Sequence, residues 1–233
     1  MIKKCTVIFF ALSSCTVSYN NNKYPADEKI NTDPSCTLLE QPYASIKRLP
    51  LERHGFFSPE NAKNLKTFIQ ALKPRIVVEL GVWLGESSFF MADLLDDNAR
   101  LYAVDTWVDY PDIKDIPYMK NMMPKAYWQF LSNCLHLGLA HKIIPVRMTS
   151  AQAAQALNIS PNLVYIDASH AEEDVFNDIV DWYPKIIQGG ICCGDDWNWE
   201  SVRKGVIRAS KELRINIHQD GTFWYFDPKQ EKI

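Results

Sequence analysis

Apolar residues follow two different spacings along the chain from residue 59 onward. Short, largely apolar runs occur at residues 75–80, 101–104, 143–146, 163–166 and 190–193. Between them, apolar residues recur every three to four positions, as Leu65, Phe68, Ile69 and Leu72 do. The runs are typical of strands buried on both faces, and the longer spacing is typical of helices with one buried face. The pattern therefore predicts strands that alternate with helices.

The intervals between these runs define the expected helices. We expect helices over residues 59–73, 85–95, 125–139, 150–157, 170–187 and 199–213. The first has Ser58 as a cap and Pro59 in its first turn, and Pro74 ends it. The strand at 143–146 contains Pro145, which predicts an edge position because proline donates no ladder hydrogen bond.

The C-terminal part of the pattern predicts a hairpin. Residues 215–217 and 223–226 are strand-like, and Asp220-Gly221 between them favours a tight turn. Five strand–helix alternations followed by this hairpin predict an α/β fold. We expect a seven-stranded, mostly parallel sheet with helices on both faces and an antiparallel C-terminal hairpin. A single domain over residues 58–229 accounts for the pattern, without an internal repeat.

Two segments depart from the alternation. Residues 106–124 form a long insertion rich in aromatic residues, proline and methionine, which is typical of a lid or binding loop. Residues 1–20 open with Met1-Ile2-Lys3-Lys4, continue with a short apolar stretch and reach Leu12-Ser13-Ser14-Cys15. This pattern resembles a bacterial lipoprotein signal, with Cys15 as the lipidated residue. The alternative is a disordered or miscalled start on a cytoplasmic protein. Residues 21–57 would be a flexible extension in either case.

Composition narrows the function classes. The chain has 233 residues and a formal charge of −3, with no basic stripe that would indicate nucleic-acid binding. No internal apolar run approaches the roughly 18 residues of a membrane span, so a membrane contact would need the N-terminal lipid. Aromatic residues make up 12% of the chain, which excludes disorder for most of it. The sequence does not reveal the oligomeric state, and a homo-oligomer is one alternative.

Acidic residues lie at or near the ends of four predicted strands. They are Glu79, Asp105, Asp167, Asp195 and Asp196. Ligands of open α/β sheets bind beyond the carboxyl ends of the strands. Carboxylates that converge there repel one another unless a cation, a proton or a ligand offsets their charge. The alternative is a set of unrelated loop carboxylates, with Asp195 or Asp196 capping the last helix.

The segment Glu79-Leu80-Gly81-Val82-Trp83-Leu84-Gly85-Glu86-Ser87 connects the first predicted strand to its helix. Gly81 and Gly85 would let a ligand approach the backbone closely. The spacing is not that of the dinucleotide fingerprint G-x-G-x-x-G, which disfavours a nicotinamide oxidoreductase. Asp105 follows 24 residues after Gly81, at the end of the next strand. An acid at that position suits a ribose diol, so the pair indicates an adenosine-containing ligand.

These motifs together resemble class I S-adenosylmethionine-dependent methyltransferases with a Rossmann-like sheet. Within that class they are most similar to bacterial small-molecule O-methyltransferases, the group of macrolide-sugar methyltransferases and cephalosporin-hydroxylase-like proteins. The resemblance covers residues 58–228 and rests on four segments: 78–87, 103–107, 165–170 and 189–197.

The resemblance implies a role for each matching residue. The methionine end of S-adenosyl-L-methionine would lie against the glycine segment, the ribose against an acid, and the adenine near two hydroxyls. These cofactor-binding candidates are Glu79, Gly81, Gly85 and Ser87, then Asp105, then Thr106 and Ser150. Metal-dependent members of the group bind Mg²⁺ at positions that correspond here to Asp167, Asp195 and Asp196. Mg²⁺ prefers oxygen ligands, which these residues offer.

His170 lies three residues after Asp167, and members with that spacing place the histidine near the substrate oxygen. The resemblance therefore implies that Asp167 and His170 are catalytic, with His170 as a general base. The chain has Glu172 where the group often has tyrosine. We expect methyl transfer to a hydroxyl oxygen of a small-molecule acceptor. The alternative is a catalytically inactive lipoprotein of the cell envelope that binds an S-adenosyl ligand, because the methyl donor is made and kept in the cytoplasm.

Overall fold

A computed structural model of the chain describes residues 41–108 and 116–230. These residues form a seven-stranded sheet in the order β3-β2-β1-β4-β5-β7-β6. The strands are β1 (Ile76–Leu80), β2 (Arg100–Asp105), β3 (Ile143–Arg147), β4 (Leu163–Ile166), β5 (Ile191–Gly194), β6 (Ile217–Asp220) and β7 (Phe223–Phe226). The first five are parallel, and β7 runs antiparallel between β5 and β6. The predicted fold class is therefore confirmed, and Pro145 lies in an edge strand as expected.

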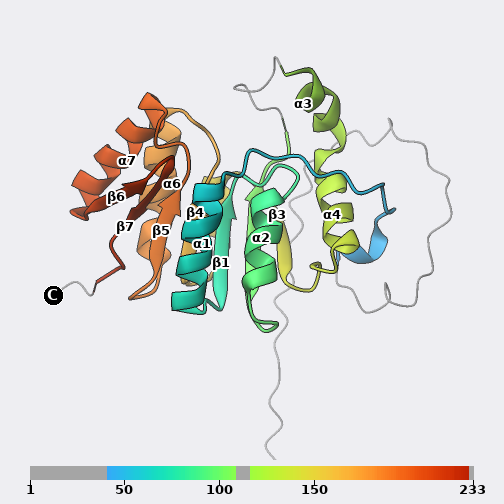
Figure 1. Cartoon of the computed structure of the whole chain (residues 1–233), viewed down its shortest axis with the longest axis horizontal. Coiled ribbons are helices and arrows are strands. Elements are labelled where there is room, and N and C mark those ends of the chain that lie inside the picture. The colour runs from blue at the N-terminus through green and yellow to red at the C-terminus, as the bar shows by residue number, and fades with distance from the viewer. Residues whose placement is uncertain (1–40, 109–115, 231–233) are drawn as a thin grey trace, which may run out of the picture. The chain divides into compact units, whose positions relative to one another are not determined.

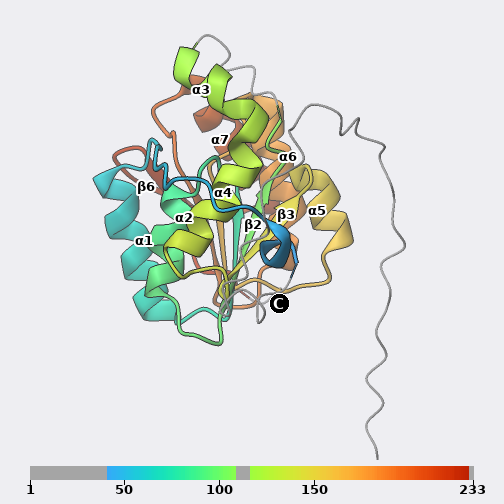
Figure 2. The same ribbon diagram turned by 90° about the vertical axis from the view of Figure 1, so that its right-hand side faces the viewer.

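Helices cover both faces of the sheet. They are α1 (Pro59–Leu72), α2 (Glu86–Leu94), α3 (Pro117–Met122), α4 (Ala126–His136), α5 (Ser150–Ala156), α6 (Glu172–Trp182) and α7 (Glu200–Leu213). Short 3₁₀ turns lie at Tyr43–Ser45 (η2), Met123–Lys125 (η4) and Tyr183–Lys185 (η5). Figure 2 shows α1, α2 and α4 on one side of the sheet, with α5 and α6 on the other.

Two hydrophobic cores result from the alternation of side chains along each strand. Val77 and Leu101 pack with α1, α2 and α4, whereas Val78 and Val104 pack with α5, α6 and α7. All four are buried, and burial of each such side chain contributes about 1.5–3 kcal/mol. Because both faces are covered, the carboxyl ends of the parallel strands are the part of the sheet that is open to ligands.

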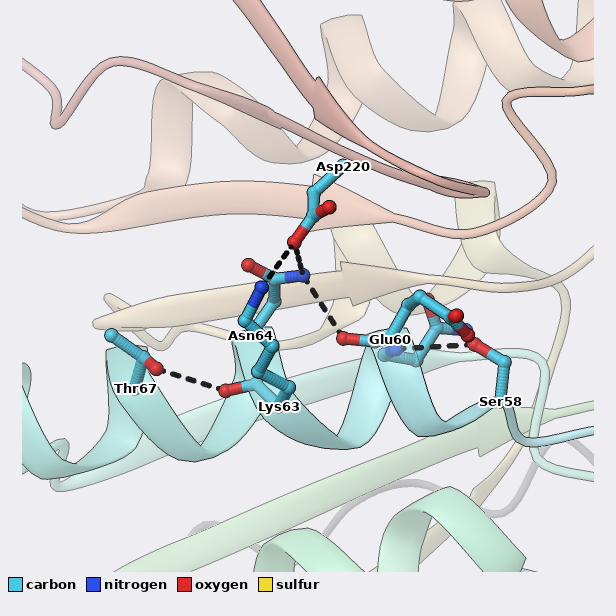
Figure 3. Close-up of polar contacts among 7 residues, drawn as sticks. Ser58, Glu60, Lys63, Asn64, Thr67 and Asp220 are labelled. Carbon is cyan, nitrogen blue, oxygen red and sulfur yellow. Dashed lines mark hydrogen bonds and ion pairs between the residues drawn. The ribbon is translucent and has the colours of Figure 1, made fainter.

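Helix α1 begins and ends where the sequence indicates. The Ser58 hydroxyl accepts a hydrogen bond from Asn61 N at 3.1 Å, and the helix ends at a left-handed Lys73 before Pro74. Lys63 and Asn64 both donate to Asp220 Oδ2, at 2.8 and 3.1 Å. Figure 3 shows these contacts, which join α1 to the turn of the C-terminal hairpin.

Residues 46–57 form an extended strap that crosses the ends of α4 and α2 before α1 begins (Figure 1). Leu49 exchanges two hydrogen bonds with the Ser132 hydroxyl, at 2.8 and 2.9 Å. Glu52 exchanges two with the Asn133 amide, at 3.2 and 2.7 Å. Ser132 and Asn133 are buried in α4, so this helix uses polar side chains on an interior face to hold the strap.

The insertion at 106–124 contains an element that its composition did not reveal. Helix α3 occupies its C-terminal end, and η4 then leads into α4. Residues 109–115 lie outside the described residues, as do the N-terminal signal pattern, Cys15 and most of the 21–57 extension. Within the described residues, no helix has both the length and the hydropathy required to cross a membrane.

Candidate active site

A cavity of about 810 Å³ opens at the carboxyl ends of β1, β2, β4 and β5. This volume is within the range of small-ligand sites. The cavity brings together most of the sequence-predicted site residues: Gly81, Ser87, Asp105, Thr106, Ser150, Asp167, His170, Asp195 and Asp196. Glu79 and Gly85 are not among its lining residues. Four of the five predicted rim carboxylates therefore converge on this cavity, and Glu79 is the exception.

Gly81 and Gly85 have left-handed backbones and tight surroundings. A Cβ on Gly81 would lie 1.9 Å from the carbonyl oxygen of Asp167, so glycine allows the loops after β1 and β4 to touch. A Cβ on Gly85 would lie 2.5 Å from Phe89 and 2.7 Å from Phe130, which are core rings. Gly81 thus forms the cavity floor, whereas Gly85 allows α2 to pack against α4.

Glu79 lies below the cavity floor and is fully buried. Its two carboxyl oxygens accept hydrogen bonds from the hydroxyls of Ser87 and Ser88 in the first turn of α2. Burial raises the pKa of Glu79 to about 8, against the two serine hydrogen bonds that lower it. Glu79 therefore positions Ser87, which faces the cavity.

Asp105 ends β2 and is 5% exposed. Its Oδ2 accepts hydrogen bonds from Val82 N and Trp83 N, at 2.8 and 3.0 Å, and its Oδ1 accepts one from Trp107 N at 2.7 Å. Trp83 and Trp107 both have positive φ, of 52° and 49°. These strained backbones bring their N–H groups onto one carboxylate, which fixes the glycine loop against β2.

Asp167, Asp195 and Asp196 form an acid cluster, with one oxygen from each lying within 4.8 Å of the others. Burial raises the pKa of Asp167 well above its usual value, and the charges of Asp195 and Asp196 raise it further. Burial also raises the pKa of Asp195. The capping alternative for Asp195 and Asp196 is wrong, because α7 begins only at Glu200.

The donor set of the acid cluster fits a hard divalent cation. Asp195 Oδ1 is buried and has no hydrogen-bond partner among the described residues. Asn61 and Thr222 still lie close enough to lower the pKa of the Asp195 carboxyl. Asp196 adopts a positive φ of 61°, which is a strained conformation for a residue other than glycine. Three convergent carboxylates offer the oxygen ligands that Mg²⁺ prefers.

His170 lies beside the acid cluster. Its Nε2 is 2.9 Å from Asp196 Oδ2, and its ring stacks on Trp199 with a centroid distance of 4.4 Å. Both His170 and Trp199 line the cavity. The aspartate and the indole together fix the plane of the imidazole ring.

The sequence did not identify two further groups at the site. His54 and Phe56 of the strap line the cavity mouth, and Phe56 is 68% exposed. Behind the acid cluster, Asn61 donates to the Tyr165 hydroxyl at 3.2 Å, and that hydroxyl donates to Asp167 Oδ2 at 3.3 Å. One signal was present for Asn61. It lies four residues before Leu65 and so shares the apolar face of α1.

Comparison with known proteins gives one family match. A family model described as a methyltransferase domain matches residues 78–197, which is just over half of the chain. This range begins in β1 and ends after the acid cluster. No curated protein matches the chain.

Solved structures share the fold. The O-methyltransferase TomG of Streptomyces achromogenes, in complex with SAM, superposes with a TM-score of 0.60. The alignment covers 75% of this chain and 82% of TomG, at 15% identity. An O-methyltransferase from Bacillus cereus, in complex with SAH, superposes with a TM-score of 0.56 at 15% identity. That alignment covers 77% of this chain and 84% of the Bacillus cereus protein.

Proposed function

The chain belongs to the methyltransferase-domain family, and we propose that it uses S-adenosyl-L-methionine to methylate a hydroxyl oxygen of a small molecule with the help of a divalent cation. The observation that carries this proposal is the shared cavity. It joins the glycine loop and Asp105 on one side to the acid cluster and His170 on the other.

The glycine loop and β2 provide groups that suit the cofactor. Gly81 lets a ligand approach the backbone, and Ser87 offers a hydroxyl whose orientation Glu79 fixes. Asp105 is held in place by backbone N–H groups and suits a ribose diol. Thr106 and Ser150 line the next part of the cavity, where the adenine would follow. The TomG and Bacillus cereus structures, which contain SAM and SAH, support this cofactor.

The acid cluster would hold the cation through Asp167, Asp195 and Asp196. When bound, S-adenosylmethionine supplies an electrophilic methyl carbon, and a divalent cation lowers the pKa of a hydroxyl that it coordinates. His170 would accept the proton of the acceptor hydroxyl, and Asp196 and Trp199 hold its ring in place for that role. The chain would contribute position and electrostatics and form no covalent bond to substrate.

Asp195→Asn separates the two halves of the proposal. With Mg²⁺ and an acceptor found by screening with labelled methyl donor, we expect turnover to fall at least about 100-fold, because the cation loses a ligand. Affinity for S-adenosylhomocysteine, measured by calorimetry, should stay within about threefold of wild type. Chelation of wild type with EDTA should have the same effect on turnover.

The control is Asp97→Asn, which makes the same chemical change at a residue whose side chain is 92% exposed. It should leave both measurements unchanged. Full turnover in excess EDTA would refute the role of the cation. Failure of the wild-type protein to bind S-adenosylhomocysteine would refute the cofactor assignment.

A further inference from the structure

His54 of the strap is held on three sides at the cavity mouth. The Trp83 indole donates from Nε1 to His54 Nδ1 at 3.3 Å. The imidazole lies against the Tyr118 ring with a centroid distance of 4.4 Å, and it makes an edge-on contact with Phe56 at 5.3 Å. These partners come from the glycine loop, from α3 and from the strap itself, so the His54 ring has a defined position.

The contact with Trp83 fixes the tautomer of His54. An indole nitrogen is only a donor, so His54 Nδ1 is the acceptor. A neutral imidazole that accepts at Nδ1 carries its proton on Nε2. Among the residues that the structure describes, none accepts a hydrogen bond from this Nε2. Because His54 lines the cavity, its Nε2–H is a donor that a ligand can use.

Attachment of the strap does not require this donor. Buried polar side chains of α4 hold one part of the strap. Arg53 donates two hydrogen bonds to Glu86 of α2, at 2.9 and 2.6 Å. The Tyr118 hydroxyl donates to Glu52 at 2.8 Å and so joins α3 to the strap. The Nε2–H of His54 is therefore left without a structural role.

Apolar side chains surround His54 on the cavity wall. Phe56, Ile116 and Met119 line the cavity together with His54, and we call these four residues the strap wall. Phe56 and Ile116 are exposed, so they offer apolar surface to the body of a ligand. His54 and Phe56 precede residue 78, where the family match begins, so that match gives them no role.

Trp83 relates the strap wall to the proposed cofactor. Its backbone N–H donates to Asp105 at 3.0 Å, and its indole N–H donates to His54. One residue of the glycine loop thus contacts both the proposed ribose ligand and the strap wall. A molecule on the strap wall would therefore lie beside the cofactor, where a methyl acceptor must be.

The charge of the cavity restricts what can bind there. Eight of its described lining residues are acidic, and none is lysine or arginine. Besides Asp105 and the acid cluster, the acids are Glu86, Asp174, Asp178 and Asp181. Arg53 offsets the charge of Glu86 from outside the lining, and a bound divalent cation would offset two further charges. An anionic ligand would still meet like charge with no side-chain partner, which disfavours its binding.

We propose that the methyl acceptor carries no negative charge, packs its apolar body on the strap wall, and is positioned by a hydrogen bond from His54 Nε2 to a second oxygen, distinct from the one that is methylated. This inference rests on the proposed function, because it assumes methyl transfer in this cavity. It assigns His54 to acceptor binding and leaves proton transfer to His170.

The first test is a screen of hydroxyl compounds, sorted by charge, with labelled S-adenosylmethionine and Mg²⁺. Wild type should methylate compounds without negative charge that contain a second oxygen. Each such compound is then compared with its analogue in which a methylene group replaces that oxygen. Loss of one hydrogen bond should lower kcat/KM about 10-fold in wild type.

His54→Phe keeps an aromatic ring beside Tyr118 but removes both nitrogens. It should raise KM for the oxygen compound about 10-fold, keep kcat within about threefold, and lose the preference over the methylene analogue. His54→Gln should restore most of that preference, because an amide can accept from Trp83 and donate to the ligand. The matched control is His141→Phe, at a histidine whose side chain is 52% exposed, and it should behave as wild type.

Affinity for S-adenosylhomocysteine, measured by calorimetry, separates the two proposals. It should stay within about threefold of wild type in His54→Phe. A loss of this affinity as large as the rise in KM would assign His54 to the cofactor and overturn the inference. An unchanged preference in His54→Phe would also overturn it, as would a wild type that binds S-adenosylhomocysteine but methylates only anions or no compound of the screen. If wild type failed to bind S-adenosylhomocysteine, the proposed function itself would fail.

Discussion

The two sides of the cavity differ in how their buried carboxylates are stabilised. On the glycine-loop side, Asp105 accepts three backbone hydrogen bonds and Glu79 accepts two from serine hydroxyls. On the other side, Asp167, Asp195 and Asp196 lie close together, and burial first and then the charges of its two neighbours raise the pKa of Asp167. The first set is satisfied by its own chain. In the second set, Asp167 accepts one hydrogen bond from Tyr165 and Asp196 contacts His170, but Asp195 Oδ1 has no hydrogen-bond partner among the described residues.

This difference distinguishes a side that is held by its own hydrogen bonds from a side where we propose that a cation binds. Two of the three N–H groups around Asp105 belong to Trp83 and Trp107, whose backbones have positive φ, so holding that carboxylate rigid costs some stability. In the acid cluster the carboxylates instead repel one another, and a bound cation would relieve that repulsion. The two sides should therefore respond differently to loss of a carboxylate.

Asp105→Ala should give the largest effect. It leaves the N–H groups of Val82, Trp83 and Trp107 without their acceptor, and each unsatisfied buried donor costs about 1–3 kcal/mol. We expect the free energy of unfolding to fall by about 3 kcal/mol or more in urea titrations. Affinity for S-adenosylhomocysteine should fall at least about 100-fold.

Asp196→Ala is the comparison on the other side. It removes like charge from the acid cluster, so its effect on the free energy of unfolding should stay within about 1 kcal/mol in the absence of divalent cations. If the two alanine variants lost similar stability, the contrast between a satisfied and an unbalanced side would be wrong.

Glu79 provides a finer test of this comparison. It lies on the glycine-loop side, but its hydrogen-bond donors are the hydroxyls of Ser87 and Ser88, not backbone N–H groups. Its pKa is raised from 4.5 to about 8. A carboxyl with a raised pKa in the folded state binds more protons there than in the unfolded state, so stability falls as pH rises between the two values. The slope from this residue is at most about 1.4 kcal/mol per pH unit.

Glu79→Gln should remove that slope. The amide can accept from one of Ser87 and Ser88 and donate to the other, so packing is retained. We expect the variant to be more stable than wild type at pH 8 by about 2 kcal/mol, and to lose this advantage near pH 5. Urea unfolding of both proteins at pH 5, 6.5 and 8 measures the effect. Parallel pH profiles for the two proteins would show that Glu79 is ionised at neutral pH.

The sequence predicted the features that follow from periodicity and strand ends. Alternating apolar runs were enough for the sheet, its edge strand and its terminal hairpin. The rule that ligands bind at strand carboxyl ends was enough to bring Asp105, Asp167 and Asp195 into one cavity. These features depend on the local pattern of apolar residues and on the order of the strands, and both can be predicted from one sequence.

Tertiary hydrogen bonds were not predictable in the same way. The strap is held by Ser132 and Asn133, which lie more than 80 residues away along the chain. Asp178 lies in α6 among several other acids, and only the structure shows that it is buried. Nothing in local spacing indicates which polar side chain will be buried, because that depends on the element packed over it.

Addition of a divalent cation should give the smallest change in stability, and it tests the acid cluster directly. A ligand that binds the folded state at ten times its dissociation constant stabilises it by about 1.4 kcal/mol. We expect Mg²⁺ or Mn²⁺ to raise the melting temperature of wild type accordingly, since the cation would neutralise charge that Asp167, Asp195 and Asp196 hold together. Asp196→Asn should lose most of this shift, whereas Asp97→Asn on the surface should keep it. An equal shift in Asp196→Asn would place the cation elsewhere on the protein, and the acid cluster would then be a source of strain without a metal role.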